Sequence, residues 1–565
     1  MSERLVLTCM KQNWKSLVII IVPILLLPMV VTGNKQMQCG YIIAIVSIFW
    51  VTEVMHIAVT SLIPIVLFPA FGILKPTQVA GCYMKDITLM LIGGLIVAKT
   101  IENQNLHRRM ALHILKLMGP NPVFQYLGFM LATWFLSMWI SNSASAAMMI
   151  TLADAVVDQW VYVAKCDDQS RKENSIEDVP GPLGLKKSKT NSFDSEESEI
   201  ITEELQQLQN VGKGLLISIA YSASVGGIAT LSGTPPNLVF YGLLEEKYKN
   251  ALGMNYGNFM LFCFPLSFTI LIIIWITILL RYVGFVTIFK KKRDPFKDKI
   301  TMKLITDEIE SLGPISYGEV STFVVFIGLV LLWILREPGF PLWGWFFIRY
   351  DAKGNKINYW TDGLSAILAT LCVFNFPSMN PFKNYKKKIS RLIDWKYIEK
   401  GFPWGFVFLF GGGFALATGC EKSGLSDVLG KSLTKLQYLP HYVIILVVCL
   451  GISLFTEFTS NSVTATVLLP TMLKMAECIN MHPIEMGLAV VISCSFAFCL
   501  PAATPPNAIV FSTGKIHVID MVSVGIFLNI ICVFLLSFLV YYYAIPIFHT
   551  NVFPSSIKKN CTWTK

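Results

Sequence analysis

Residues 137–143 read Ser-Met-Trp-Ile-Ser-Asn-Ser, and residues 456–462 read Thr-Glu-Phe-Thr-Ser-Asn-Ser. The two heptapeptides are separated by 456 − 137 = 319 residues, and the same offset places Gly93 on Gly412. A second motif, Thr-Pro-Pro-Asn, begins at residues 234 and 504, an offset of 270. The difference, 319 − 270 = 49, is close to the length of a charged segment, residues 165–213, that only the first half carries. The chain is therefore a duplicated unit with one insertion.

The first heptapeptide interrupts an uncharged segment, residues 117–153, that is too long for one membrane span and too short for two. Two half-helices that meet at the Ser-Asn-Ser of residues 141–143 would form a re-entrant hairpin, which returns to the side that it entered. A second hairpin, at about residues 442–473, would carry the same tip at residues 460–462. Each Pro-Pro pair lies in an apolar run and breaks a helix, which predicts a span that unwinds in its middle. Unwound backbone lies at membrane depth only where protein buries it or where it lines a cavity.

The composition indicates a membrane protein. Of the 565 residues, 54% are hydrophobic and 15% are charged, and the mean hydropathy is +0.58. An ordinary soluble domain has about 25% charged residues. Many segments without Asp, Glu, Lys or Arg approach or exceed the roughly 20 residues of a spanning helix; they are residues 16–34, 54–74, 214–244, 250–280, 363–382, 402–420, 436–456, 486–514 and 521–557. These runs exclude a soluble enzyme, a secreted disulfide scaffold and a nucleic-acid binder, and the predicted fold class is an all-α polytopic membrane protein.

The distribution of charge predicts the orientation. Basic residues gather in the N-terminus and at residues 107–109, 290–293 and 386–391, which indicates that these segments are cytoplasmic. The single Asn-x-Ser/Thr sequon is at Asn560, whose glycosylation would place the C-terminus outside. An inside start and an outside end require an odd number of spans, and about eleven spans plus two hairpins satisfy the charged loops. The hairpins then open to opposite sides, so the repeat is inverted, which is an architecture of secondary transporters.

These features divide the chain into predicted segments. They are first-repeat scaffold helices (1–116), a cytoplasm-opening re-entrant hairpin (117–164), a cytoplasmic charged loop (165–213), first-repeat transport helices with a broken helix (214–289), second-repeat scaffold helices (290–435), an outside-opening re-entrant hairpin (436–480), second-repeat transport helices with a broken helix (481–549) and an extracellular C-terminal tail (550–565). The charged loop is expected to be disordered or loosely helical. The thirteen cysteines lie mostly in apolar runs, so they are expected to be buried thiols rather than a disulfide framework.

The hairpin tips and helix breaks carry the predicted chemistry. Half-helix N-termini offer N–H groups and positive dipole ends to an anion, and hydroxyls, Asn oxygens and freed carbonyls suit sodium. Neither tip contains Lys or Arg, so an anion there needs bound cations to neutralise its charge. The offset of 319 also pairs Ser137 with Thr456, one helical turn before each tip. Glu457 is an intramembrane acid that either serves the site or pairs at the mouth of the hairpin. The glycines at 93–94 and 412–413 are expected to be close-packing sites, and no constellation indicates catalysis or a bound metal cofactor.

The sequence resembles the divalent anion/sodium symporters, and more narrowly the solute carrier family 13 sodium/dicarboxylate, citrate and sulfate cotransporters, including the INDY type. The resemblance covers nearly the whole chain. It is carried by both heptapeptides and by Trp-Val-Thr-Glu at 50–53, Asn-Leu-His-Arg-Arg at 105–109, Ser-Phe-Ala-Phe at 495–498 and Ala-Thr-Pro-Pro-Asn-Ala-Ile-Val-Phe at 503–511. Tips in that family are commonly Ser-Asn-Thr, whereas here both end in Ser, at Ser143 and Ser462.

The resemblance implies two sodium sites with a substrate site, a homodimer, and an elevator mechanism in which a transport part carries the site past a scaffold. The implied sodium ligands are Ser137, Ser141, Asn142 and Gly233 in one site and Thr456, Ser460, Asn461 and Ala503 in the other. The implied substrate contacts are Asn142, Ser143, Thr234, Asn461, Ser462, Thr504 and Pro505. Sodium is the co-transported ion, and no organic cofactor or nucleic-acid partner is implied.

The predicted function is a sodium-coupled symporter that imports di- and tricarboxylates of the succinate and citrate class across the plasma membrane. The second-half motif resembles the carboxylate branch, since sulfate-type members more often carry Asn at the position of Thr504. A sodium-coupled sulfate symporter is the alternative within the family. An ion channel with re-entrant loops is the alternative from another class.

Overall fold

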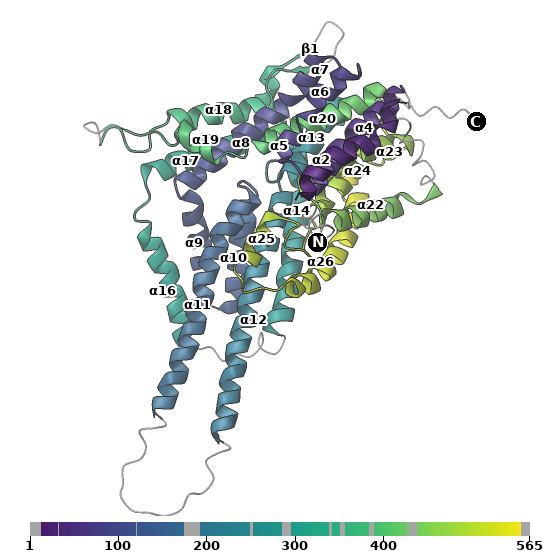
Figure 1. Cartoon of the computed structure of the whole chain (residues 1–565). Coiled ribbons are helices and arrows are strands. Elements are labelled where there is room, and N and C mark those ends of the chain that lie inside the picture. The colour runs from purple at the N-terminus through teal and green to yellow at the C-terminus, as the bar shows by residue number, and fades with distance from the viewer. Residues whose placement is uncertain are drawn as a thin grey trace, which may run out of the picture.

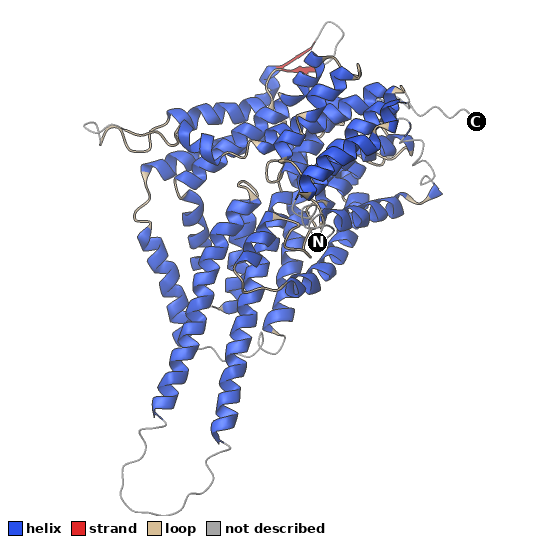
Figure 2. Ribbon diagram, in the orientation of Figure 1, coloured by secondary structure: helices blue, strands red, loops and turns tan. Residues whose placement is uncertain are grey.

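The computed structural model describes residues 13–31, 33–119, 121–174, 193–248, 252–284, 295–337, 342–350, 356–383, 389–426, 428 and 438–554. Helices make up nearly all of its regular structure (Figures 1 and 2). The exception is a two-stranded antiparallel sheet, β1 (Ile348–Tyr350) with β2 (Lys356–Asn358), in which Arg349 pairs with Ile357. The prediction of an all-α membrane protein is therefore confirmed apart from this short hairpin.

The predicted scaffold segments form two groups of helices. The first group is α2 (Trp14–Leu26), α3 (Pro28–Val31), α4 (Lys35–Thr52), α5 (Ile57–Thr60), α6 (Ile63–Ala70), α7 (Pro76–Tyr83), α8 (Asp86–Asn103) and α9 (Leu106–Met118). The second is α16 (Pro295–Ser311), α17 (Tyr317–Ile334), η2 (Trp343–Phe347), α18 (Asp362–Asn375), α19 (Trp395–Gly401) and α20 (Gly405–Ser423). Helices α8 and α18 lie against each other (Figure 1).

The glycines at 93 and 412 are close-packing sites, as the sequence predicts. A Cβ on Gly93 would lie 2.6 Å from the carbonyl carbon of Ala366 on α18, and a Cβ on Gly412 would lie 3.0 Å from the carbonyl oxygen of Ser61. Real Cβ atoms are rarely that close to backbone, so any larger residue would separate the helices. Gly94 is less tightly packed, since a Cβ there would lie 3.6 Å from the ring of Trp333, and it lines the central cavity described below.

Two helical hairpins carry the repeated heptapeptides. The first consists of α10 (Pro122–Ser137) and α11 (Asn142–Asn174), and the second of α22 (His441–Thr456) and α23 (Asn461–Cys478). The helices that meet at each tip end and begin at positions separated by the same 319 residues, since 456 − 137 = 319 and 461 − 142 = 319. The repeat read from the sequence is therefore a repeat of backbone conformation.

Two helices are interrupted where the sequence places Pro-Pro. Helix α12 (Phe193–Ile228) unwinds before α13 (Pro235–Tyr248), and α24 (Pro483–Ser493) unwinds before α25 (Pro505–Ser512). Each second half begins at the first proline of its motif, because proline lacks an N–H and its fixed φ suits the first helical position. The chain continues through α14 (Tyr256–Ile278) and the π-helical turn η1 (Leu279–Val283) in the first half, and through α26 (Val518–Tyr542) and α27 (Ala544–Phe548) in the second.

The structure adds detail to two expectations, the extent of the charged segment and the state of the cysteines. Helices α11 and α12 project side by side from the body (Figure 1) and extend to Asn174 and from Phe193, so the predicted boundaries at 164 and 213 fall inside helices. Residues such as Glu, Gln, Leu and Lys favour helix even where no core is buried. Residues 175–192 lie outside the described part. Among the described cysteines nine are free thiols, but Cys478 is disulfide-bonded.

Six described helical segments are long and apolar enough to cross a membrane, or up to seven if the bent pair α19–α20, with its 62° angle, forms one span. The six are Trp14–Val31, Pro76–Asn103, Gln206–Ile228, Tyr256–Val283, Tyr317–Ile334 and Val518–Tyr542. Helix α12 passes this criterion, but the hairpin helices α10 and α22, at 16 residues each, and the interrupted-helix halves α24 and α25, at 11 and 8 residues, are too short for it. The count of about eleven spans therefore stays a prediction.

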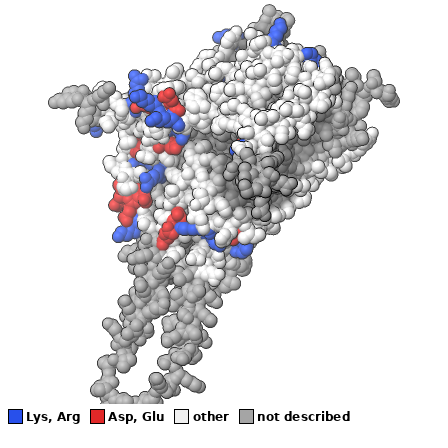
Figure 3. Space-filling view, viewed as in Figure 1, with Lys and Arg blue, Asp and Glu red and all other residues white. Residues whose placement is uncertain are grey.

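The surface agrees with a multi-pass membrane protein. Large apolar side chains are exposed on α2, α14, α17, α18 and α26; examples are Ile24, Leu261, Val324, Leu371 and Phe527. Figure 3 shows a broad surface free of Lys, Arg, Asp and Glu, with the charged residues gathered mainly along one edge. Exposed apolar surface on this scale is expected where helices contact lipid.

Candidate functional site

A central cavity of about 710 Å³ lies between the hairpin tips, the unwound segments and helices α4, α8 and α17 of the predicted scaffold segments. Every residue that the resemblance implies for substrate contact lines it, namely Asn142, Ser143, Thr234, Asn461, Ser462, Thr504 and Pro505. Six of the eight implied sodium ligands also line it, namely Ser141, Asn142, Gly233, Ser460, Asn461 and Ala503. Residues that are 319 or 270 positions apart in the chain thus meet around one space.

The other two implied ligands, Ser137 and Thr456, lie directly behind the tips. Ser137 Oγ donates to Asn142 Oδ1 at 2.6 Å and is also 2.6 Å from the carbonyl oxygen of Ala223 on α12. Thr456 Oγ1 is 2.9 Å from Asn461 Oδ1 and 2.9 Å from the carbonyl oxygen of Cys494. In each half, one hydroxyl therefore joins the tip asparagine to the neighbouring interrupted helix.

Glycine leaves room for an oxygen cluster at the first tip. A Cβ on Gly227 would lie 2.7 Å from Asn142 Oδ1, 3.0 Å from Asn142 Nδ2 and 3.1 Å from the carbonyl oxygen of Gly233. The amide group of Asn142 and the carbonyl of Gly233 thus border the same small space. Neutral oxygens around a space of this kind are suitable ligands for a hard monovalent cation.

The electrostatics of the cavity favour an anion only with help from cations. Among the described residues that line it, Glu53 is the only ionisable one, and none is Lys or Arg. Four helices, α11, α13, α23 and α25, begin at or beside the cavity with Asn142, Pro235, Asn461 and Pro505. Their N-termini supply partial positive charge. Because no cationic side chain lines the wall, bound cations would have to balance the rest of an anion's charge.

Glu457 pairs within the protein rather than facing the cavity. It is buried, and its carboxylate accepts from the backbone N–H groups of Cys499 and Leu500 at 3.0–3.1 Å and from Asn529 Nδ2 at 2.7 Å. The offset of 319 pairs Glu457 with Met138, whose carbonyl oxygen accepts from Thr230 Oγ1 at 2.6 Å. In both halves a hydrogen bond thus joins the tip to the unwound segment, through the carboxylate of Glu457 in the second half and through the backbone carbonyl of Met138 in the first.

Comparison with known proteins gives matches over nearly the whole length of the chain. The family model described as the sodium:sulfate symporter transmembrane region matches residues 10–550. The chain belongs to the sodium:sulfate symporter family. Relatives include human solute carrier family 13 member 2, 38% identical over 98% of this chain and 97% of the relative. They also include the Na(+)/dicarboxylate cotransporter 3 of Rattus norvegicus, at 36% identity over 96% and 94%. The Na(+)/citrate cotransporter of the same species is 35% identical over 96% and 97%.

The cavity of this sodium:sulfate symporter family member has an aromatic wall that was not predicted from the sequence. Trp139 and Phe458 occupy equivalent positions in the two heptapeptides, and both line the cavity. Trp139 contacts Phe326 of α17 edge to face, with 5.3 Å between ring centroids, so this residue joins a hairpin tip to the scaffold. The offset of 319 could have identified the aromatic pair, whereas the partner on α17 is visible only in the fold.

The sequence places Arg109 in a basic cluster that is predicted to mark the cytoplasmic side, and it gives no sign that this residue is buried and paired. The structure places it at 7% exposure, with its Nε 2.9 Å from Glu319 Oε1 at the start of α17. Its Nη2 also donates to the carbonyl oxygens of Leu312 and Gly313 at 3.2 and 3.0 Å. Buried charges require this degree of pairing, so Arg109 holds α9 to α17 rather than serving as a free surface charge.

Proposed function

We propose that this protein is a sodium-coupled symporter that imports di- and tricarboxylates of the succinate and citrate class. The observation that carries the proposal is the cavity, in which two equivalent oxygen-rich tips meet and no described cationic side chain is present. An extended dianion can place one carboxylate at each tip, while sodium ions balance its charge. Relatives whose names include Na(+)/dicarboxylate and Na(+)/citrate cotransporter support this class of substrate.

The proposed sodium sites are Ser137, Ser141, Asn142 and Gly233 in the first half, and Thr456, Ser460, Asn461 and Ala503 in the second. The substrate would contact Asn142, Ser143, Thr234, Asn461, Ser462, Thr504 and Pro505. The hydrogen bonds from Ser137 and Thr456 to the tip asparagines support this assignment, because they preorganise the oxygens that face each site.

The proposed topology has about eleven spans and two hairpins that open to opposite sides, with a cytoplasmic N-terminus and an extracellular C-terminus. The disulfide at Cys478 supports this orientation. Disulfides form and persist in oxidising compartments, so this bond supports an outside position for the end of α23, where the second hairpin is proposed to open. The sequon at Asn560 lies outside the described residues, and its glycosylation is part of the same proposal. A homodimer and an elevator motion complete it.

The family model's description names sulfate, so sulfate is the alternative within the family. Thr504, together with the size of the cavity, favours a carboxylate over a compact tetrahedral ion. The alternative from another class is a channel, which would show uncoupled ion flux that does not saturate with substrate. We propose that the protein is not an enzyme, since relatives are named as transporters.

Radiolabelled uptake in cells or proteoliposomes tests the proposal. Succinate and citrate uptake should saturate, should require sodium on the outside, and should stop when choline replaces sodium. Uptake that is independent of sodium would overturn the proposal, and so would sodium-dependent uptake of sulfate alone.

A further inference from the structure

Two asparagines in the interrupted helices, one in each half, share two equivalent hydrogen bonds to backbone carbonyl groups. Asn237 is 1% exposed, and its Nδ2 lies 2.7 Å from the carbonyl oxygen of Thr230 and 3.2 Å from that of Gly227. Asn507 is fully buried, and its Nδ2 lies 3.1 Å from the carbonyl oxygen of Leu500 and 2.9 Å from that of Ala497. All three positions are related by the offset of 270, since 507 − 237, 500 − 230 and 497 − 227 each give 270.

Each side-chain amide, from the helix that follows the break, donates to carbonyl oxygens that precede the break or lie within it. Carbonyl groups in a helix break lose their helical partners and must find others. The side chain of Asn237 supplies these donors from the helix that follows the break, so it fixes the two ends of the break relative to each other. The segment held in this way contains Gly233, and the corresponding segment in the second half contains Ala503.

The first clamp acts directly on the floor of the proposed sodium site. Gly227, whose carbonyl accepts from Asn237, is the residue whose Cβ would lie 2.7 Å from Asn142 Oδ1 and 3.1 Å from the carbonyl oxygen of Gly233. Moving Gly227 would therefore change the distances between the oxygens that face that space. Neither asparagine lines the cavity itself, so neither contacts the substrate.

Packing alone does not account for asparagine at these positions. In the described part of the chain, Oδ1 of Asn237 and Oδ1 of Asn507 are both buried and have no hydrogen-bond partner. An apolar side chain of similar volume would fill the same space without leaving an acceptor unpaired. The side chains are therefore held through their donor groups. In both halves the unpaired oxygen lowers the stability of the fold, and asparagine is nevertheless present.

We infer that Asn237 and Asn507 are positioning residues for the two sodium sites, with Asn237 serving the site of Asn142 and Asn507 serving the site of Asn461. This inference rests on the proposed function, because it takes sodium as the coupling ion. It assigns to the last residue of each Thr-Pro-Pro-Asn motif a role in sodium affinity rather than in substrate contact.

The test compares Asn237→Leu and Asn507→Leu with Asn103→Leu. Asn103 also donates an amide N–H to a carbonyl oxygen, that of Leu392 at 3.0 Å, but in the scaffold. Sodium activation of succinate uptake is measured at saturating succinate, and the succinate KM is measured at saturating sodium, both normalised to surface protein. The sodium concentration for half-maximal uptake should rise by at least roughly fivefold in the first two variants, because each variant loses two or more hydrogen bonds to carbonyl oxygens and the loss of one such bond has about that effect. Their succinate KM at saturating sodium, and both values for Asn103→Leu, should stay near the wild type.

A second pair of variants separates positioning from folding. Asn237→Asp and Asn507→Asp keep the shape but place an acceptor against the carbonyl oxygens, so sodium activation should weaken at least as much as in the leucine variants. Sodium-dependent thermal stabilisation of the purified protein, measured without substrate, should shift to higher sodium concentration in all four. A lower maximal rate with an unchanged sodium curve would overturn the inference, and so would failure of both variants at a position to fold.

The uptake measurements distinguish a failure of the proposed function from a failure of the inference about the asparagines. If wild-type uptake does not depend on sodium, the proposed function fails. If wild-type uptake depends on sodium but the variants keep the wild-type sodium curve, only the inference about the asparagines fails.

Discussion

The Thr456 hydroxyl lies 2.9 Å from Asn461 Oδ1, across the four-residue tip of the second hairpin. The same hydroxyl is 2.9 Å from the carbonyl oxygen of Cys494, at the start of the second helix break. Ser137 makes the equivalent pair of contacts in the first half. The tip asparagine is therefore aligned by the helix that precedes it and by the interrupted helix beside it, before any ligand arrives.

Asn142→Ala and Asn461→Ala should each abolish sodium-dependent uptake while the protein still reaches the cell surface. Each change removes an amide oxygen that faces the cavity and is proposed to serve both the cation and the substrate. Surface biotinylation and radiolabelled succinate uptake measure the two properties separately. Loss of surface protein would indicate a structural role for these asparagines, and normal uptake would mean that the site lies elsewhere.

Gly227→Ala should reduce uptake, whereas Gly451→Ala should not. A Cβ at Gly227 would meet Asn142 Oδ1 at 2.7 Å, and a Cβ at Gly451, on a hairpin helix, would meet nothing within 4 Å. Overpacking a buried site costs about 1–3 kcal/mol, which corresponds to roughly tenfold or more in an equilibrium constant. Uptake per surface protein should therefore fall by about tenfold in the first variant. Equal activity of the two variants would contradict the assigned cluster of oxygens.

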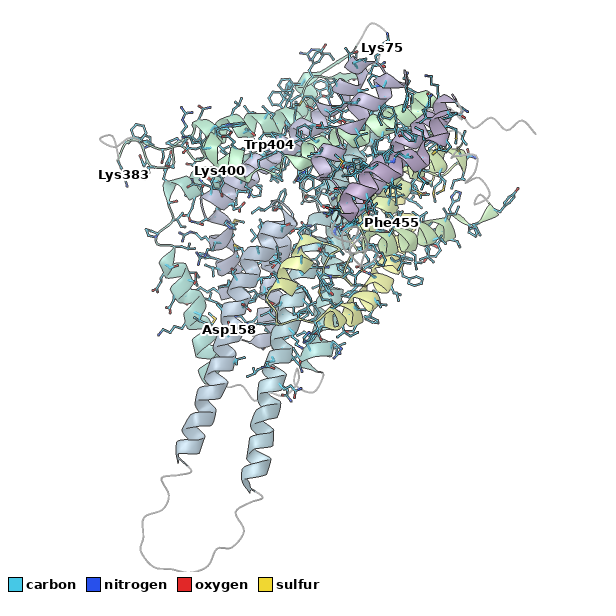
Figure 4. The ribbon with its side chains drawn as sticks, in the orientation of Figure 1. Lys75, Asp158, Lys383, Lys400, Trp404 and Phe455 are labelled. Carbon is cyan, nitrogen blue, oxygen red and sulfur yellow. The ribbon has the colours of Figure 1, made fainter. Side chains whose placement is uncertain are left out.

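The proposed topology predicts that Asn560 is glycosylated and that residues 165–213 are cytoplasmic. Figure 4 shows Asp158 about halfway along α11, near the point where that helix leaves the body, and Lys75 near the opposite end of the molecule. An Asn560→Gln variant should migrate like wild-type protein treated with a glycosidase. A protease applied to intact cells should not cleave the 165–213 segment, and cleavage there would rule out the topology.

Sulfate in excess should not inhibit succinate uptake. The tips present similar oxygens on both sides of the cavity. An extended dicarboxylate can place one charged group at each tip, whereas the charge of a compact ion such as sulfate is centred at one point. Serine in place of threonine at residues 143 and 462 removes a methyl group from each tip, which should also admit bulkier acids such as citrate. Competition assays at fixed sodium measure the order of preference. Stronger inhibition by sulfate than by unlabelled succinate would overturn the carboxylate assignment, although the fold and the coupling to sodium could still stand.

Much of the candidate site could be predicted from the sequence because the motifs are local. The Ser-Asn-Ser tips and the Pro-Pro breaks act on neighbouring backbone, and duplication made each of them recognisable twice. The orientation of Glu457 could not be predicted, since its partners Cys499 and Asn529 are 42 and 72 residues away. The same holds for Arg109, which pairs with Glu319 across 210 residues. Burial converts such residues from apparent functional groups into structural ones, and burial is a property of the whole fold.

The sequence by itself determined that the chain is an all-α membrane protein with an internal repeat, two hairpin tips and two interrupted helices. Uncharged runs, proline pairs and a constant offset are sufficient for that, because each acts within a few helical turns. Only the tertiary structure decided that Asn142, Thr234, Asn461 and Thr504 line one cavity, and that described Lys and Arg side chains are absent from its wall. It also showed helices continuing into the charged segment and a disulfide at Cys478. These features depend on which segments pack together across hundreds of residues, and local patterns carry no information about that packing.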